Sequence, residues 1–223
     1  MYLITKRIFD IVVSLIMLLV LAPILIPIVI ALKLSGEGCI WYFQERVGYK
    51  NSTFSIYKFA TMLKDSPNMS TGIITTIGDP RITPMGGILR KTKINELPQL
   101  LNILLGDMSF VGPRPVMRIS FEAYPAEIQA VIYNIKPGLT GVGSIVFRDE
   151  EELITKKMNA GEDTWNFYTN KIYPHKGELE NWYQNHLSFI TDVKLMLLTA
   201  LVVIFPKNTL IYKWFPSLPV RGF

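Results

Sequence analysis

The sequence has almost none of the residues that build disulfides and thiolate metal sites. Cys39 is the only cysteine among 223 residues, so no intramolecular disulfide can form and metal sites with two thiolates are excluded. The single thiol suits a reducing compartment without proving one. With His175 and His186 as the only histidines, the chain has little material for a histidine-rich zinc site or a Ser-His-Asp triad.

Charged residues are also scarce. Asp, Glu, Lys and Arg make up 18% of the chain, below the roughly 25% usual for soluble domains, whereas 49% of the residues are hydrophobic. This balance predicts that part of the protein faces lipid. The net charge of +5 suits nucleic acid, an anionic membrane surface or a phosphorylated small molecule equally well. No nucleic-acid-binding module is recognisable, and we expect no nucleic acid partner.

The longest uncharged segment covers residues 11–32, and basic residues flank it on both sides, with Lys6 and Arg7 before it. As a helix it would be roughly 33 Å long, enough to cross a bilayer. A cleaved signal peptide fits less well, because the segment is too long and no small-residue cleavage site ends it. Pro23 and Pro27 favour a kink, and the two basic flanks indicate no preferred side of the membrane. The residues alone leave both a spanning helix and a bent, re-entrant segment open.

The middle of the chain has the pattern of a mixed α/β, helix-rich domain. Residues 39–43 and 53–59 predict two short strands around a turn-rich segment. Helices are expected at residues 85–92 and 96–105, the second with leucines at helical spacing. Asn95 is a plausible N-cap for that second helix. These elements predict one small domain rather than a repeat or a fibrous structure.

We divide the chain into three parts. Residues 1–35 form the membrane segment, residues 36–205 form the α/β domain with interfacial amphipathic helices, and residues 206–223 form a C-terminal tail. Within the domain, residues 195–205 are apolar and helical but too few to span a bilayer. This helix belongs either to the core or to the membrane surface, where it could also support a homodimer.

Basic side chains gather in residues 79–118, which hold six Lys or Arg against three Asp or Glu. Arg114 is the most unusual, because Pro113 and Pro115 fix the backbone on either side of it. A guanidinium on such a rigid platform can bind a phosphate through two parallel hydrogen bonds. The alternative is a buried ion pair with a carboxylate such as Asp107.

Other residues could complete a phosphate site. Lys58 is expected on or just after a strand and could supply a second phosphate contact, or it could be an ordinary exposed strand lysine. Arg81 and Arg148 are further candidates for phosphate binding. Glu96, placed near these cations and a helix start, would stay ionised and could act as a base or bind Mg²⁺. Its alternative role is that of a plain first-turn acid.

Taken together, these segments resemble the bacterial sugar transferase family, the monotopic phosphoglycosyl transferases or undecaprenyl-phosphate sugar phosphotransferases. The matches run in the family's order over roughly residues 6–148. They are Lys6-Arg-Ile-Phe-Asp10, Phe43-Gln-Glu-Arg-Val-Gly48, Tyr57-Lys-Phe59, Thr61-Met62, Gly78-Asp-Pro-Arg-Ile-Thr83, Asn95-Glu-Leu-Pro-Gln-Leu100, Gly106-Asp-Met-Ser109, Val111-Gly-Pro-Arg-Pro115 and Lys136-Pro-Gly-Leu-Thr140.

The resemblance implies a function. Members of the family transfer a sugar phosphate from a UDP-sugar to undecaprenyl phosphate and release UMP, with Mg²⁺ as cofactor, as the first membrane step of polysaccharide or glycoconjugate synthesis. They work on the cytoplasmic face of the bacterial inner membrane. Their N-terminal helix bends at a proline, here Pro23, and re-enters on the same side. Lys6 and Arg7 would then anchor this segment to anionic headgroups of the bilayer.

Two positions depart from the family pattern. Ala60 stands where members usually have Arg, and Asn95-Glu96 stands where they have Asp-Glu. In the family the Asp forms a covalent phosphosugar intermediate, assisted by the Glu and Mg²⁺. An amide is not a nucleophile of that kind and has no charge to hold the metal.

Three interpretations of Asn95 follow, with Asn95 and Glu96 still the catalytic and metal-binding candidates. Glu96 could act as nucleophile, or as base in a direct attack by the lipid phosphate. Asn95 could be a substitution introduced to trap a substrate complex. The chain could also be a silent protein that binds nucleotide sugars without transferring them. We expect an active enzyme, because the surrounding phosphate-binding residues are present; the donor sugar is not specified.

Overall fold

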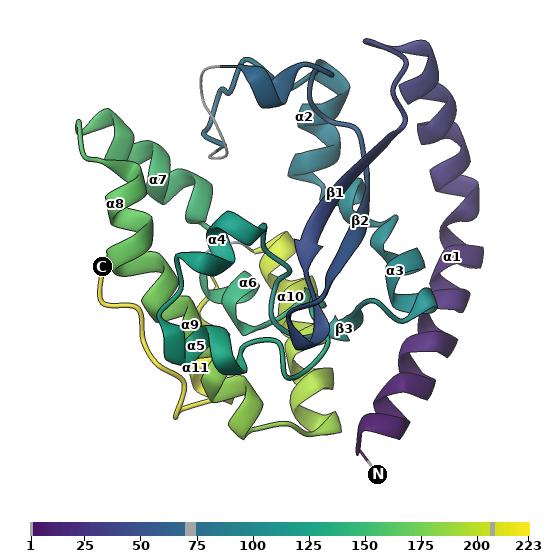
Figure 1. Cartoon of the computed structure of the whole chain (residues 1–223). Helices are drawn as coiled ribbons and strands as arrows, with labels where there is room; N and C mark the ends of the chain where they lie inside the picture. The colour runs from purple at the N-terminus through teal and green to yellow at the C-terminus, as the bar shows by residue number, and fades with distance from the viewer. Residues whose placement is uncertain (1, 70–74, 206–207) are drawn as a thin grey trace.

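The computed structural model describes residues 2–69, 75–205 and 208–223. It is a helix-rich mixed α/β protein, as the sequence predicted, with a long N-terminal helix beside a domain that contains two small sheets (Figure 1). The elements in chain order are α1 Tyr2–Leu34, β1 Trp41–Val47, η1 Tyr49–Asn51, β2 Thr53–Phe59, η2 Ser66–Asn68, α2 Pro84–Lys91, η3 Ile94–Glu96, α3 Gln99–Leu105, β3 Ser109–Val111, α4 Arg118–Glu122, α5 Ala126–Val131, β4 Gly138–Thr140, α6 Val142–Val146, α7 Glu150–Asn159, α8 Thr164–Phe167, η4 Tyr168–Ile172, α9 Tyr173–Asn185, α10 Phe189–Ile204 and α11 Leu210–Trp214.

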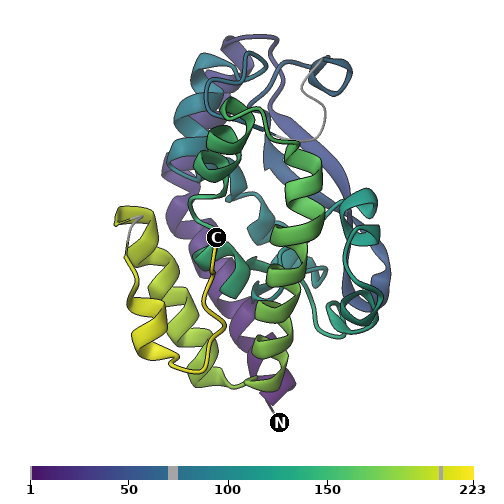
Figure 2. The ribbon, with the colours of Figure 1, turned by 90° about the vertical axis from the view of Figure 1, so that its left-hand side faces the viewer.

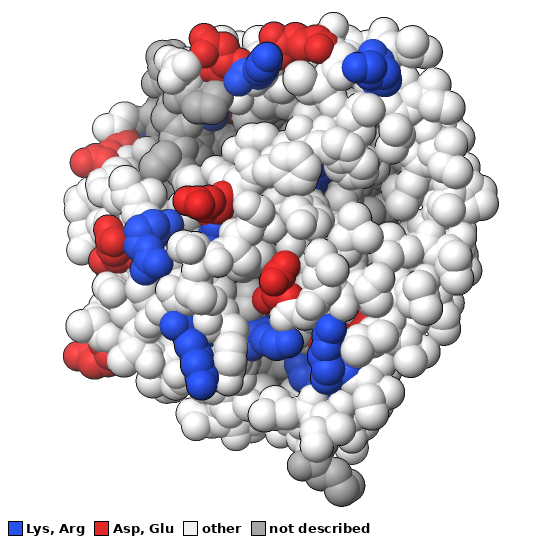
Figure 3. Space-filling model, turned by 45° about the vertical axis from the view of Figure 1, so that its right-hand side comes forward, with Lys and Arg blue, Asp and Glu red and all other residues white. Residues whose placement is uncertain are grey.

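Helix α1 is one continuous helix of 33 residues that passes through Pro23 and Pro27. The break expected at Pro23 is therefore not an end of the helix, because a proline can bend a helix while the helical path continues on either side. Among the described residues, α1 is the one helix long and apolar enough to cross a membrane, and only 6% of its most apolar stretch is buried. In Figure 3 the right-hand part of the surface, on the side of α1, shows almost no Lys, Arg, Asp or Glu.

Polar contacts dock the N-terminal half of α1 on the domain. Lys6 Nζ lies 2.6 Å from the carboxylate of Asp192 at the start of α10. Arg7 donates to two carbonyls of the last turn of α3, at 2.6 and 2.9 Å, where a cation is favoured by the helix dipole. Asp10 is buried and accepts the backbone N–H of Phe110 on β3 at 3.1 Å. Because Lys6 and Arg7 have these partners within the protein, their contact with headgroups stays a prediction.

The other end of α1 is fixed by apolar packing. Leu32 is buried in one cluster with Phe59 at the end of β2 and Leu89 of α2. A helix of this length covers roughly 50 Å. Both ends of α1 therefore contact the same domain.

The predicted strand at residues 53–59 is confirmed as β2, and its partner β1 begins at Trp41 rather than at residue 39. The two strands pair antiparallel. Asn102 of α3 holds this hairpin, because its Oδ1 accepts from Tyr57 N–H at 2.9 Å and its Nδ2 donates to the Ser55 carbonyl at 2.8 Å. This buried amide sets the position of the β2 side chains relative to α3.

The predicted helix at residues 96–105 is divided in the structure. Ile94–Glu96 forms the 3₁₀ turn η3, and the α-helix α3 begins only at Gln99. Pro98 has no N–H to continue the hydrogen-bond ladder, which accounts for the division. Asn95 lies inside the 3₁₀ turn and is not the N-cap that the sequence suggested. The neighbouring helix α2 agrees with its prediction within one residue.

The described tail, residues 208–223, is part of the main core rather than a separate segment. Ile211, Phe215 and Leu218 are buried in the cluster that also contains the inner face of α10. Figure 2 shows α10 and α11 side by side at one edge of the molecule. The outer face of α10 leaves apolar side chains exposed, which suits a membrane surface. They include Ile190, Leu197 and Ile204.

Candidate functional site

The structure brings two predicted phosphate-binding residues together around the carboxylate of a third predicted site residue. Glu96 on η3 lies between Lys58 of β2 and Arg114, which follows β3. Its Oε1 is 3.0 Å from Lys58 Nζ and 2.6 Å from an Arg114 nitrogen. The Glu96 and Lys58 side chains are only 12% and 15% exposed, so Lys58 is not an ordinary surface lysine. Arg114 pairs with Glu96 and not with Asp107, the alternative considered above.

The charges in this site fix the protonation of Glu96. Burial alone would raise its pKa, but Arg114, Lys58 and Lys93 together hold the pKa well below its ordinary value. Burial lowers the pKa of Lys58 to about 8, with the Arg114 and Arg46 charges adding to this and Glu96 opposing it. At neutral pH the carboxylate is therefore ionised and the ammonium keeps its proton.

Two further cations, which the sequence reasoning did not assign to the site, complete what we name the Glu96 cluster: Arg46, Lys58, Lys93, Glu96 and Arg114. Burial and the Arg114 charge lower the pKa of Arg46 to about 10, and its Nε is buried without a partner among the described residues. Lys93 is exposed and has a positive φ of 62°. Its pKa is lowered by burial and by the Arg114 charge, while the Glu96 charge raises it. The described part of the cluster thus sets four cations around one carboxylate.

Arg114 stands on a rigid platform, as its flanking prolines predicted. The Tyr133 hydroxyl donates to the Arg114 carbonyl at 2.8 Å and accepts from Val116 N–H at 3.1 Å. Behind it, Gly112 and Gly138 pack backbone to backbone; a Cβ on Gly138 would lie 2.1 Å from the Gly112 nitrogen. Two segments that resemble the family therefore hold one another, and no side chain fits between them.

Asn95 is next to Glu96 and only 7% exposed. Its Oδ1 is buried without a hydrogen-bond partner in the described chain. A buried acceptor of this kind normally has a partner, because a buried polar atom without a hydrogen bond costs about 1–3 kcal/mol of folding free energy. The unpaired oxygen thus marks a place where a ligand atom would be stabilising.

The remaining phosphate candidates lie elsewhere or at the edge. Arg81 is buried and forms a two-pronged ion pair with Asp79, whose carboxylate lies 2.7 Å from one Arg81 nitrogen. This ion pair gives Arg81 a partner within the protein, and phosphate binding by Arg81 stays a prediction. Arg148 is half-buried, and its charge contributes to lowering the pKa of Lys93. Arg148 is thus near the rim of the Glu96 cluster.

The donor set at Asn95 and Glu96 is compatible with Mg²⁺. No group of three His, Cys, Asp or Glu side chains gathers within the described ranges. Mg²⁺ is commonly held by one or two carboxylates together with substrate phosphates. The Glu96 carboxylate is a donor of this kind, and the unpaired Asn95 amide oxygen beside it is a neutral oxygen donor, so Mg²⁺ stays a prediction.

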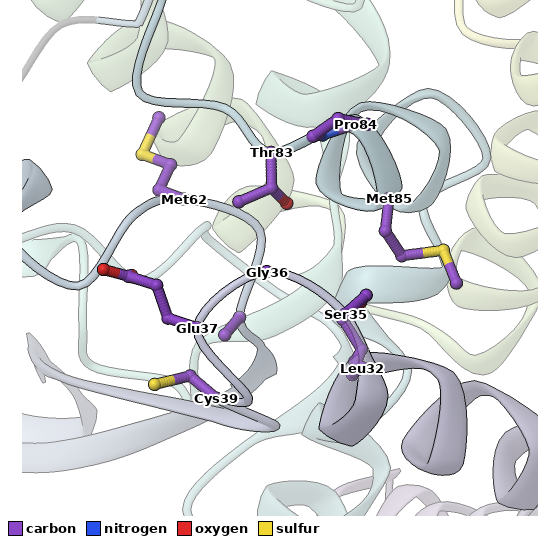
Figure 4. Close-up of a pocket in the computed structure, with 10 residues that line it drawn as sticks. Leu32, Ser35, Gly36, Glu37, Cys39, Met62, Thr83, Pro84 and Met85 are labelled. Carbon is purple, nitrogen blue, oxygen red and sulfur yellow. The ribbon is translucent and has the colours of Figure 1, made fainter.

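A separate cavity of about 130 Å³ lies where α1 ends, and none of the Glu96 cluster lines it. Figure 4 shows its wall, made by the end of α1, the segment after it and the start of α2. Ala60, at the position where the family pattern has Arg, belongs to this wall, as does Cys39. The lone thiol therefore lines this cavity and is not part of the Glu96 cluster.

A model of the bacterial sugar transferase family matches residues 1–206. The chain belongs to the bacterial sugar transferase family. The exopolysaccharide production protein ExoY of Sinorhizobium fredii is 36% identical to this chain, in a match that covers 69% of this chain and 74% of that protein. This sugar transferase is also similar to two proteins whose names state a reaction.

One is the UDP-glucose:undecaprenyl-phosphate glucose-1-phosphate transferase of Caulobacter vibrioides, 33% identical over 87% of this chain and 68% of that protein. The other is the undecaprenyl-phosphate glucose phosphotransferase of Komagataeibacter xylinus, 35% identical over 66% of this chain. The match covers only 30% of that longer protein. Family membership makes this chain an enzyme, a sugar-phosphate transferase.

Proposed function

We propose that this sugar transferase moves a sugar phosphate from a UDP-sugar to undecaprenyl phosphate, giving undecaprenyl-diphosphate-sugar and UMP. The observation that carries the proposal is the Glu96 cluster, in which four cations surround one carboxylate. Phosphoryl transfer needs mainly positioning and charge neutralisation, which such a cluster supplies. The names of the Caulobacter and Komagataeibacter relatives support the same class of reaction.

The chain's own residues have distinct roles in this proposal. Arg114 and Lys58 bind phosphate oxygens, with Arg46 and Lys93 completing the cationic wall. Glu96 keeps these cations in place before the substrate arrives and supplies a carboxylate oxygen to Mg²⁺. The metal, when bound, neutralises charge on the phosphate oxygens. A silent nucleotide-sugar-binding protein is less well supported, because the cluster is intact despite Asn95.

The docking of α1 supports an enzyme attached to one face of a membrane. Lys6 and Asp10 at one end of α1 contact the domain, and Leu32 at the other end contacts the same domain. If α1 crossed the bilayer, these two contact regions would lie on opposite sides of it. These contacts support a helix that returns to the face on which the domain lies. We propose that this face is the cytoplasmic face of the inner membrane, because UDP-sugars are found there.

The test is UMP release by the full-length protein in nanodiscs that contain undecaprenyl phosphate. UDP-glucose, UDP-galactose and UDP-N-acetylgalactosamine form the donor panel. We expect release with at least one donor, and a fall of about 100-fold or more in Glu96→Gln. Glu127→Gln, on the exposed face of α5, is the matched control and should keep the wild-type rate. No release from any donor would overturn the proposed function.

A further inference from the structure

The described tail, residues 208–223, lies beyond the part of the chain that matches the family model, which stops at residue 206. A residue of this tail nevertheless contacts the segment at the rim of the cluster. Resting on the proposed function, we infer that Arg221 is a positioning residue: through Asp149 it holds the segment that carries Arg148, so that Arg148 can bind a substrate phosphate.

Arg221 forms a two-pronged ion pair with Asp149, the residue that precedes α7. Its two terminal nitrogens donate to the two carboxylate oxygens of Asp149, at 2.7 and 2.6 Å. Two parallel hydrogen bonds of this kind fix the direction of a contact as well as its length. Asp149 is the N-cap residue of α7, but its side chain makes no capping hydrogen bond within the described structure. Its carboxylate therefore connects α7 to the tail rather than to the backbone of its own helix.

The tail also holds Phe147, the residue before Arg148. Phe147 is buried, and the Arg221 guanidinium lies 5.3 Å from the centre of its ring. The Lys176 ammonium of α9 lies 5.1 Å from the same ring, and the ring of Phe223 lies 6.3 Å away. Figure 1 shows the tail running from α11 to the side of α8. Contacts from two distant parts of the chain thus fix the backbone that enters Arg148.

Glu150, two residues after Arg148, connects this segment with the cluster. Its carboxylate pairs with Lys176 at 2.7 Å and accepts the Tyr168 hydroxyl at 2.9 Å. Burial alone would raise the pKa of Glu150, but Lys176, Tyr168 and the charge of Arg114 together hold the pKa below its ordinary value. The segment that carries Arg148 is therefore close enough to Arg114 for their charges to interact.

Arg148 is the member of residues 147–150 whose side chain has no ion pair or hydrogen bond with the described residues. It is half-buried, and its charge acts on Lys93 of the cluster. An unpaired charge that is partly removed from water raises the free energy of the protein, and a bound anion lowers it. The anion that fits is a phosphate group held jointly with the cluster, either of the donor or of undecaprenyl phosphate.

Arg221 helps Arg148 in two ways. It fixes the backbone at Asp149, so less conformational freedom is lost when Arg148 binds a phosphate. It also occupies the Asp149 carboxylate, which would otherwise be a free anion directly beside Arg148. A free carboxylate there would compete with the phosphate for the guanidinium.

The rate of UMP release by the full-length protein in nanodiscs, with the active donor of the panel, tests this inference. We expect Arg148→Ala to lower kcat/KM by about 10-fold or more, because a charged hydrogen bond to phosphate is lost. Arg221→Ala should lower it by about 5-fold through misplacement of Arg148. A raised KM for the UDP-sugar assigns this phosphate to the donor, and a raised KM for undecaprenyl phosphate assigns it to the lipid. Lys213→Ala removes an exposed basic residue of the same tail and should keep the wild-type rate.

The double variant Arg148→Ala/Arg221→Ala distinguishes positioning from general stabilisation. If Arg221 acts through Arg148, the double variant should match Arg148→Ala alone to within about two-fold. Asp149→Ala removes the other half of the ion pair and should reproduce the loss in Arg221→Ala, which provides a second variant if one folds poorly.

Two results would contradict the inference. Losses that multiply in the double variant, or an unchanged kcat/KM for both substrates in Arg221→Ala and Asp149→Ala, would show that the tail does not act through Arg148. Either result leaves the proposed function standing. No UMP release from any donor by the wild type would overturn both.

Discussion

At the scale of single residues, Lys58 sets the most accessible pH dependence. Burial lowers its pKa to about 8, so its ammonium is charged at neutral pH and loses the proton as the pH rises through that value. We expect kcat/KM for the UDP-sugar to fall above pH about 8, because the neutral amine no longer binds a phosphate oxygen and kcat/KM reports groups of the free enzyme. Initial rates at low donor concentration, across a pH range that brackets this value, measure the effect.

The variant Lys58→Arg is the control for that profile. A guanidinium keeps its proton throughout the range, so the alkaline fall should disappear or move to higher pH. Unfolding does not explain the fall. The Lys58 pKa is about 8 in the folded protein and about 10 in the unfolded chain. Between these two values the unfolded chain binds more protons, so the free energy of unfolding rises with pH. An unchanged alkaline fall in Lys58→Arg would contradict the assignment.

The sequence predicted the centre of the site better than its surroundings. Arg114 was recognisable because prolines flank it, and Glu96 because it is the acid among cations. Arg46 was missed, since nothing in a strand sequence shows which distant cations its side chain will meet. The ion pair of Arg81 with Asp79, only two residues away, was not predicted, because the sequence could not distinguish a local ion pair from a ligand contact.

At the scale of secondary-structure elements, one polar contact connects α1 to the strand that leads to Arg114. Asp10 accepts the Phe110 N–H on β3, and β3 leads directly to Arg114. We expect Asp10→Leu to cost about 1–3 kcal/mol of unfolding free energy, because it leaves this buried N–H without an acceptor. The rate of UMP release should fall as well, because Arg114 loses its fixed position. Thermal unfolding in detergent and transfer assays measure the two effects.

Two further variants show whether the hydrogen bond is responsible. Asp10→Asn keeps an acceptor oxygen and should retain most of the stability and activity. Ser14→Ala alters a buried residue on α1 whose hydroxyl donates, within the described part of the chain, to the Ile11 carbonyl of its own helix, and it should resemble the wild type. Equal losses in Asp10→Leu and Ser14→Ala would mean that general packing of α1, rather than this contact, is important.

Elements were predictable where the pattern was local. β2 was found at its observed bounds, because β-branched and aromatic residues alternate between turn residues. The division of the helix at Pro98 could not be predicted, because a proline in a first helical turn and a proline that follows a 3₁₀ turn look alike in sequence. The tail was taken as separate, since the packing of Phe215 and Leu218 depends on helices that precede them by many residues.

At the scale of the whole molecule, the arrangement of α1 predicts a defined topology. Leu3 and Lys33 are exposed near its two ends and can each be replaced by cysteine in a Cys39→Ser background. We expect both thiols to react with a membrane-impermeant reagent in inverted inner-membrane vesicles and neither to react in intact spheroplasts. Cysteines that react from opposite sides would establish a spanning helix and contradict the proposed placement.

The contacts of α1 also determine the order in which parts of the structure can form during synthesis of the chain. Tyr2 donates a hydrogen bond to Asp192, a residue 190 positions later in the chain, and Lys6 pairs with the same carboxylate. At ribosomal rates of about 5–20 residues per second, α1 emerges roughly 10–40 s before this partner exists. Throughout that interval the first turns of α1 lack their polar partner on α10, although Leu32 near the other end can already pack against Phe59 and Leu89. The far C-terminal part of the domain therefore completes the docking of the helix that was synthesised first.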